Sequence, residues 1–301
     1  MAINTTAIRS LLRPGLQAVW ASEQMYPSEW SEVFTQHSSD KAVEIDVEIK
    51  MLGLAQIRPE GSATAFDSMG QRSQTSYVNK YVSIGFIITR QAIKDNLYKT
   101  RFPMQAKALK NTMNQTKEII CANVFNNGFS TSFPIGDGQP FFSSSHPIDG
   151  GVVANQPAIA ADLNETSLEA ALVAISQFKS SSGLIVMAKP QKLLVPPALM
   201  FTAARLMKSQ FRTNTANNDV SAIFAMGAVP QGERINHFLT STSAWFVTTD
   251  MNENGLKMLQ REELEVDIWT EPTTDNLQVK AIERYSAGVT DFRCCYGSNG
   301  P

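Results

Sequence analysis

The stretch "VEIDVEIKM" at residues 43–51 decides the fold, because apolar and charged side chains alternate along it without a break. A two-residue period predicts a half-buried strand. Residues 78–88 repeat the period, with Val78, Lys80, Val82, Ile84, Phe86 and Ile88 on one face. Residues 58–76 between the two runs are rich in Gly, Ser and Thr. The sequence therefore predicts a long β-hairpin with a mobile tip.

A hairpin of this length needs a surface to lie on. An arm running from residue 43 to residue 58 reaches about 50 Å at about 3.3 Å per residue. Two-stranded hairpins are marginally stable alone in water. We therefore expect this one to lie on a partner.

The chain around the hairpin indicates a mixed α+β protein. A helix is predicted over residues 103–126, where apolar residues recur at three- and four-residue steps. Residues 155–250 alternate between predicted strands (184–187, 192–195 and 244–249) and helices. One helix starts at a capping box from Thr166 to Glu169, and another follows Pro196 and Pro197. A second hairpin, from about residue 264, closes the chain.

Residues 1–40 read as short helical pieces broken at Pro14 and Pro27. Trp20, Trp30 and Phe34 are large apolar anchors without a common period. Such a segment buries little by itself, so we expect it to dock on its own subunit or on another.

Composition excludes several classes of protein. The 301 residues carry a net charge of −2, which argues against a dedicated nucleic-acid reader. Three cysteines do not make a disulfide framework, and a reducing environment suits them. No apolar run reaches the roughly 18 residues of a membrane span. Arg9, Arg13 and Pro14 interrupt the first 20 residues, which therefore make a poor signal peptide.

The stretch "GDGQPFFSSSHP" at residues 136–147 raises the question of catalysis. A serine hydrolase needs a serine, an imidazole and an acid brought together, and the chain has no G-x-S-x-G elbow. Ser145 and His146 are sequence neighbours, whereas triad members usually come from separate loops. No Walker motif, H-E-x-x-H or C-x-x-C occurs. We predict no catalytic, metal or cofactor site and keep a Ser/His hydrolase as a minor alternative.

Charge is unevenly distributed along the chain. Residues 91–118 hold six basic and two acidic residues, and residues 250–275 hold eight acidic and two basic ones. This separation suits charge pairing between copies or a basic stripe facing a polyanion. Ordinary solvated surface explains it equally well.

The order of these elements resembles the major capsid proteins of tailed bacteriophages, which have the Hong Kong 97-like fold. Three motifs resemble the Mu-type major head subunit group in particular. They are Asp137-Gly138-Gln139 with Phe141-Phe142 and His146-Pro147, the run "KLLVPPALMFTAARLM" at 192–207, and the tail "GVTDFRCCYGSNG" at 288–300.

The resemblance implies a layout for the whole chain. Residues 1–40 are expected to form an N-terminal arm anchored by Trp20, Trp30 and Phe34, and residues 41–90 an extended loop. The peripheral domain with its spine helix covers residues 91–154, the axial domain 155–262, and the closing hairpin of the peripheral domain 263–301.

The resemblance also implies a structural role without enzymatic activity or cofactors. Copies are expected to form pentamers and hexamers of an icosahedral shell around packaged double-stranded DNA, as part of a virion assembled in the host bacterial cytoplasm. Portal and decoration proteins are potential partners, and a scaffold would be separate or already removed, because no long charged helix precedes residue 40. An encapsulin-type nanocompartment is the alternative.

Two sets of site residues follow from this layout. Charged residues near the tip of the extended loop are expected to form ion pairs between subunits; these are Arg58, Glu60, Asp67 and Arg72. A stripe on the spine helix is expected to face DNA through sequence-independent contacts; it consists of Lys107, Lys110 and Lys117.

Overall fold

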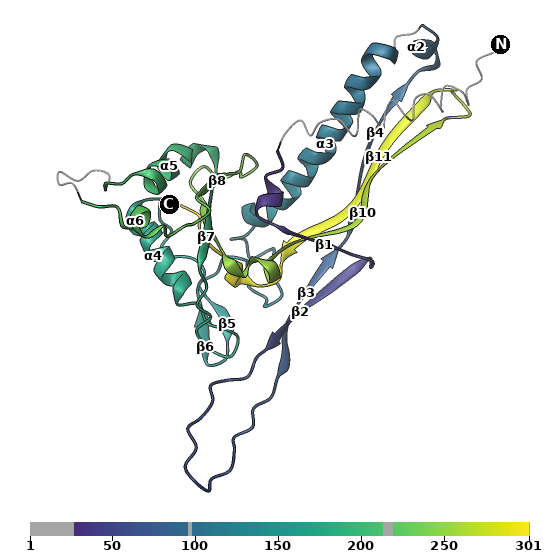
Figure 1. Cartoon of the computed structure of the whole chain (residues 1–301). Helices are drawn as coiled ribbons and strands as arrows, with labels where there is room; N and C mark the ends of the chain where they lie inside the picture. Colours follow the sequence, from purple (N-terminus) through teal and green to yellow (C-terminus); the bar gives the residue numbers. More distant parts are fainter. Residues whose placement is uncertain (1–26, 96–97, 213–218, 301) are drawn as a thin grey trace.

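The structure is a computed structural model, and it describes residues 27–95, 98–212 and 219–300. These residues form two units of sheet and helix, and a long hairpin projects away from both (Figure 1). We call the units the long-sheet unit and the short-sheet unit.

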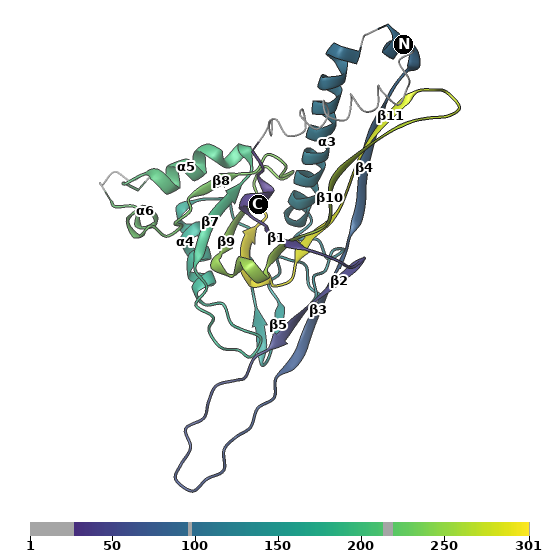
Figure 2. The same ribbon diagram turned by 45° about the vertical axis from the view of Figure 1, so that its right-hand side comes forward.

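The long-sheet unit is a four-stranded sheet in the order β1-β10-β11-β4, with helix α3 lying along one face (Figures 1 and 2). Helix α3 packs Leu109 and Met113 against Leu277 and Val279 of the sheet. The short helix α2 precedes it in the chain. The bounds are β1 (Thr35–Ser38), β4 (Lys80–Ile88), α2 (Arg90–Lys94), α3 (Tyr98–Asn126), β10 (Leu256–Thr270) and β11 (Leu277–Val289).

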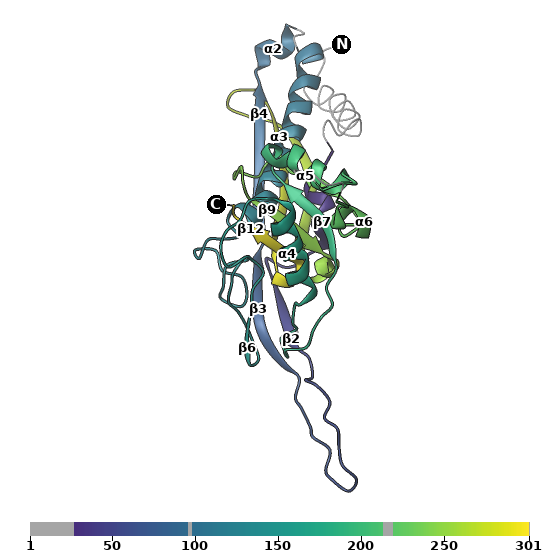
Figure 3. The same cartoon turned by 90° about the vertical axis from the view of Figure 1, so that its left-hand side faces the viewer.

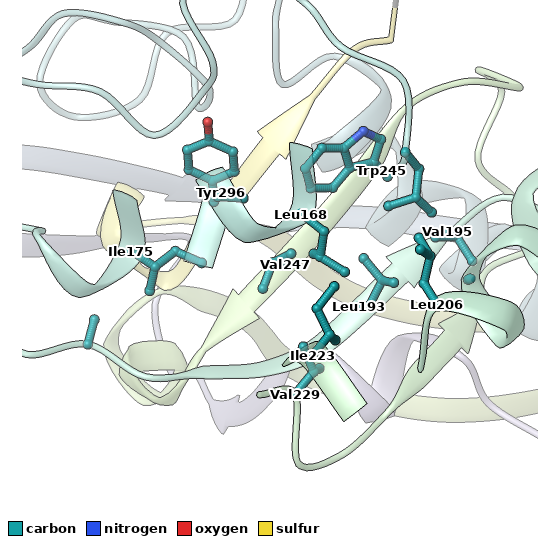
Figure 4. Close-up of a cluster of buried hydrophobic side chains, with 14 of the residues drawn as sticks. Leu168, Ile175, Leu193, Val195, Leu206, Ile223, Val229, Trp245, Val247 and Tyr296 are labelled. Atoms are coloured by element: carbon teal, nitrogen blue, oxygen red, sulfur yellow. The ribbon is translucent and has the colours of Figure 1, made fainter. Parts of the chain in front are cut away.

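The short-sheet unit is a second four-stranded sheet, in the order β12-β9-β7-β8, with three helices beside it. Its core gathers Leu168, Leu193, Trp245 and Val247 (Figure 4). The bounds are α4 (Glu165–Ser176), β7 (Pro190–Val195), α5 (Met200–Lys208), α6 (Ala222–Met226), β8 (Glu233–Ile235), β9 (Trp245–Thr249) and β12 (Cys295–Ser298).

Aromatic side chains join the two units. Phe125 of α3 lies 5.1 Å from Phe246 of β9, and Phe141 and Phe142 lie 4.1 Å apart in the same cluster, all between ring centroids. The two phenylalanines of the 136–147 stretch are therefore core residues. Outside the two large sheets and the hairpin, β5 (His146–Ile148) and β6 (Gly151–Val153) form a two-stranded sheet, and the short helical turns are η1 (Trp30–Glu32), η2 (Pro197–Leu199), η3 (Asp250–Asn254) and η4 (Phe292–Cys294).

The predicted hairpin exists, but its pairing differs from the prediction. Strand β2 (Val43–Lys50) pairs with β3 (Gly70–Val78), whereas residues 80–88 form β4 and pair with β11. The chain leaves one sheet and enters the other at Asn79. Strand β3 is polar, which is why the sequence placed it in the tip. Residues 51–69 form the loop that projects from the body (Figures 1 and 3).

Other boundaries also shifted. Helix α3 begins at Tyr98 rather than residue 103, and α4 is capped by Asn164 and Ser167 instead of Thr166 and Glu169. Residues 184–187 form an isolated bridge at Ile185 rather than a strand. The strands at 192–195 and 244–249 and the closing hairpin are confirmed.

Replacing Leu168 of α4 by Ala should destabilise the chain, because Leu168 is fully buried in the short-sheet core. A cavity of this kind costs about 2–5 kcal/mol of unfolding free energy. Val173 on the same helix is exposed, so Val173→Ala should change stability by less than about 1 kcal/mol. Urea denaturation of the two variants measures the difference, and equal losses would contradict the assigned core face of α4.

Candidate assembly surfaces

The charged row of β2 faces its own subunit. Asp46 pairs with Lys257 and accepts a hydrogen bond from Thr290 Oγ1 at 2.7 Å. Glu48 accepts one from Arg293 Nη1 at 3.1 Å. Burial raises the pKa of Asp46, but the hydrogen bonds from Lys257 and Thr290 outweigh it and leave the pKa below its ordinary value. These contacts of Asp46 and Glu48 attach the base of the hairpin to the body of the subunit, and we call them the seat of the hairpin.

The apolar row of β2 faces away from the subunit. Ile45 and Ile49 are each 57% exposed, and Val43 and its cross-strand partner Val78 are exposed as well. The usual arrangement, with apolar residues toward the core and polar ones toward water, is therefore reversed. Contiguous apolar surface on a folded chain marks an interaction site.

The loop of residues 51–69 extends this apolar surface beyond the strands. Leu54 is 81% exposed, Phe66 94%, and Ile57 is fully exposed. Large apolar side chains standing free on a projecting loop gain nothing from their own subunit. The loop and the outer face of β2 together are called the apolar arm below.

Three of the four predicted tip residues lie in this loop. Arg58 donates from Nη1 to Thr64 Oγ1 at 2.8 Å, and Glu60 lies exposed in the turn at the far end. Asp67 accepts from the backbone of Gly53 at 2.8 Å. Hydrogen bonds from the Gly53 and Ser68 amides hold the pKa of Asp67 below its ordinary value. Their predicted pairing with another subunit stays a prediction.

Arg72 does not lie at the tip, which corrects the sequence-based placement. It belongs to β3 and contacts Asp149, with Nη1 at 3.1 Å from Oδ1, and it donates to Pro147 O at 2.6 Å. Lys50 of β2 lies 2.6 Å from the other oxygen of Asp149. The hydrogen bond from Lys50 is the main cause that lowers the pKa of Asp149. Both strands of the hairpin are thus tied to the turn between β5 and β6.

The predicted N-terminal anchors have different outcomes. Phe34 is buried and Trp30 half-buried against their own subunit, whereas Trp20 lies outside the described residues. Glu118 of α3 accepts from the backbone amides of Glu29 and Trp30 at 3.0 and 2.9 Å. Burial raises the pKa of Glu118, and these hydrogen bonds partly oppose it. The segment before β1 is thereby fixed to α3.

The three lysines of the predicted stripe lie in different environments. Lys117 forms an ion pair with the buried Glu283 of β11, and its Nζ lies 5.1 Å from the centre of the Tyr285 ring. Lys117 is therefore placed inside the subunit, which differs from the predicted DNA-facing position. Lys107 is exposed and Lys110 half-buried, and their DNA-facing role stays a prediction.

His146 occupies a closed polar site. Its Nδ1 lies 2.6 Å from Asp137 Oδ2 and its Nε2 3.1 Å from Asn155 Oδ1, and the residue is fully buried. Both ring nitrogens are thus engaged by groups other than the neighbouring serine hydroxyls. The geometry suits a structural joint better than a nucleophile and its base.

Two residues that hold the hairpin, Asp149 and Arg293, were not predicted from the sequence. Residues 146–153, "HPIDGGVV", carry an Asp-Gly turn between apolar residues, which is a hairpin signal that would have placed Asp149 at a turn. Arg293 lies in the tail motif at residues 288–300, yet no pattern in the sequence pairs it with Glu48, which is 245 residues away.

The comparison with protein families shows to which family the chain belongs. A model of the phage capsid protein family matches residues 72–298, which is most of the chain. The chain belongs to the phage capsid protein family. A search of curated proteins found no match to this capsid protein.

Solved structures share the fold of this capsid protein. The structure of Microbacterium phage Oxtober96 has a TM-score of 0.57 at 11% identity, covering 99% of this chain and 98% of the other. The bacteriophage JBD30 capsid decorated with minor capsid protein trimers gives 0.58 at 16% identity, covering 79% and 100%. A virus-like particle from Pyrococcus furiosus gives 0.52 at 10% identity, covering 97% of each chain. The predicted α+β, Hong Kong 97-like capsid fold is confirmed.

Two further features concern the described part of this capsid protein. Among those residues, no cluster of His, Cys, Asp or Glu is suited to hold a metal ion. None of the described helices combines the length and the apolar character that crossing a membrane requires.

Asp149→Asn should loosen the hairpin, because Lys50 and Arg72 lose an ionised acceptor. We expect amide hydrogen exchange of β2 and β3 at pH 7 to rise about two- to fivefold, the scale of exposed ion pairs. Since the folded pKa of Asp149 is lowered, the wild-type tether is complete above about pH 3.9 and is lost as pH falls through the lowered value.

Exchange measured by mass spectrometry, corrected for the intrinsic pH dependence, should therefore separate the two proteins at pH 7, and the difference should shrink as the pH falls below about 3.9 through the lowered pKa of Asp149. Glu263→Gln, an exposed change on β10, is the control. Equal exchange in wild type and Asp149→Asn at pH 7 would show that Asp149 is not a tether.

Proposed function

We propose that this capsid protein is a major head subunit, and that its copies assemble as pentamers and hexamers into the icosahedral shell of a phage virion. One observation carries the proposal: the hairpin bonds its charged row to its own subunit and presents the apolar arm outward. An apolar surface of this kind marks a site that a further molecule covers, and identical copies provide such a cover.

The proposed mechanism of assembly is additive. Each copy lays its apolar arm on a neighbour, and burying apolar surface contributes about 25 cal/mol per Å². Every copy both gives and receives such contacts, so weak individual contacts sum through multivalency. In this proposal the hairpin of β2 and β3 acts as the extended loop, the long-sheet unit as the peripheral domain and the short-sheet unit as the axial domain, with β4 and all of β10 counted in the peripheral domain and β12 in the axial domain.

The interior and the partners are further parts of the proposal. Packaged double-stranded DNA is contacted by non-specific electrostatics, with Lys107 and Lys110 as candidates. Portal, scaffolding and decoration proteins bind as separate chains, and assembly takes place in the host bacterial cytoplasm. The three sequence motifs support membership of the Mu-type group.

A shell with another content is the second candidate. The virus-like particle from Pyrococcus furiosus shares the fold over 97% of both chains, so the fold alone does not identify what a shell of this kind encloses, and an encapsulin-type nanocompartment is the alternative to a phage head. Particles purified from the producing cell decide between them. Packaged double-stranded DNA supports the phage head, and an enclosed enzyme supports the nanocompartment.

Negative-stain electron microscopy of the purified chain tests assembly itself. Closed shells of uniform diameter are expected. A protein that stays monomeric over the concentrations and salt conditions tested, and with its co-expressed partners, would contradict the proposal.

Ile45→Asp and Ile49→Asp should each abolish shell formation while the subunit stays folded. Both side chains point away from the subunit, so the new charge is solvated in the monomer and buried without a partner in the shell. Shell yield by gradient sedimentation should fall at least about tenfold, with an unchanged circular dichroism spectrum. Ile45→Leu, which keeps the apolar surface, should assemble normally, and normal shells from both Asp variants would refute the role of the apolar arm.

Charge reversal at the loop tip tests the predicted ion pairs separately. Arg58→Glu and Glu60→Lys should lower shell yield severalfold and leave the subunit folded, because both residues are exposed at the far end of the arm. Added salt should reduce the difference from wild type if the contacts are electrostatic. Normal particles from both reversals would remove these two residues from the interface.

A further inference from the structure

Phe292 of η4 is a buried ring on which two polar side chains rest. The His146 ring stacks on it at 3.9 Å between centroids with an angle of 2° between planes. The guanidinium carbon of Arg293 lies 4.4 Å from the same centroid. All three residues are buried. An imidazole stacked on an aromatic ring and a guanidinium above its face are both favourable contacts, and they gain strength where water is excluded.

The His146 end of this group holds the connection between the two units. Asn155 donates from Nδ2 to Phe141 O at 2.7 Å and accepts at Oδ1 from Ser143 N at 2.8 Å, which fixes the orientation of its amide. His146 Nε2 must therefore carry a hydrogen and donate it to Asn155 Oδ1. His146 Nδ1 lies 2.6 Å from Asp137 Oδ2. The position of the imidazole is thus set by the turn after α3 and by the chain after β6.

The Arg293 end holds the seat of the hairpin. Its Nη1 donates to Glu48 Oε1 at 3.1 Å and to Asp291 Oδ1 at 2.9 Å. Its Nε donates to Lys179 O at 2.6 Å, in the chain that follows α4. Among the described residues, Nη2 has no hydrogen-bond partner. One edge of the guanidinium is therefore held by packing alone, and the Phe292 ring supplies a planar surface for it.

We propose that His146, Phe292 and Arg293 form a hub that couples the seat of the extended hairpin to the junction of the long-sheet and short-sheet units. A displacement of the hairpin moves Glu48 and, through their hydrogen bond, Arg293. A displacement of the junction moves Asp137 and Asn155 and, through their contacts with its ring, His146. Phe292 transmits a displacement between them because both planar groups rest on its ring. A change in the angle of the hairpin is then accompanied by a change at the junction.

The hub is a property of one subunit, so it does not depend on the proposed assembly. It differs from the Asp149 tether, which joins the hairpin to a surface turn through the exposed Asp149 and the half-buried Lys50 and Arg72. The Asp149 tether restrains the hairpin, but it does not couple the position of the hairpin to the junction of the two units. The two therefore make different predictions for residues 151–155.

Phe292→Leu tests the hub, because leucine keeps an apolar side chain and removes the stacking plane. Hydrogen exchange by mass spectrometry on the full chain, compared in one assembly state, should rise about tenfold in both residues 43–50 and residues 151–155. Leu109→Ala is the control, since Leu109 of α3 is about as buried as Phe292 but packs in the long-sheet core against Leu277 and Val279, apart from the hub and from both segments. It should leave the exchange of both segments unchanged.

Arg293→Lys is the second variant and decides the question if Phe292→Leu does not fold. Lysine keeps the charge near Glu48 but cannot stack as a planar group. The hub predicts faster exchange in residues 43–50 and also in residues 151–155. A rise confined to residues 43–50 in either variant, or no rise at all, would overturn the hub and leave Arg293 as a local ion-pair partner of the hairpin.

Discussion

The branch at Asn79 is the constraint on which the rest of the structure depends. There one continuous extended chain stops pairing with β2 and begins pairing with β11. Asn79 is buried, and its amide donates to Ser39 Oγ and Lys41 O while accepting from Ser286 Oγ. Buried polar groups are costly unless they are paired, and here every side-chain polar atom has a partner. The hairpin therefore leaves the body at one place and in one direction.

That direction explains why the alternation of β2 is reversed. A strand that lay on its own core would turn Ile45 and Ile49 inward, and a register slip of one residue would do so. Such a slip would bring the side chains of Asp46 and Glu48 away from Lys257 and Arg293. Ion pairs at the seat thus keep the apolar row outward, where it is useful only to a molecule that covers it.

The fold class could be predicted from the sequence, whereas most of the long-range contacts could not. The alternation at 43–51, the long helix and the closing hairpin depend on local periodicity, so they were predictable. The partner of β2 was not, because β3 has a polar sequence and its place depends on Tyr77, whose side chain packs against the body near Thr290. Likewise Lys117 looked like a surface residue until Glu283, far along the chain, gave it a buried partner. Long-range pairing is absent from any local pattern.

Ion pairs act together with the buried ring of Tyr77 to hold the hairpin, and the use of ion pairs has a physical consequence. Replacing a buried ion pair by apolar residues is often neutral or stabilising, so Arg293 and Glu48 are weak evidence for stability and better evidence for specified geometry. An apolar seat would tolerate many hairpin angles, since the hydrophobic effect has no direction. Hydrogen-bonded charges fix distance and angle together. For a hairpin whose outward face must meet another molecule, a fixed direction matters more than additional stability.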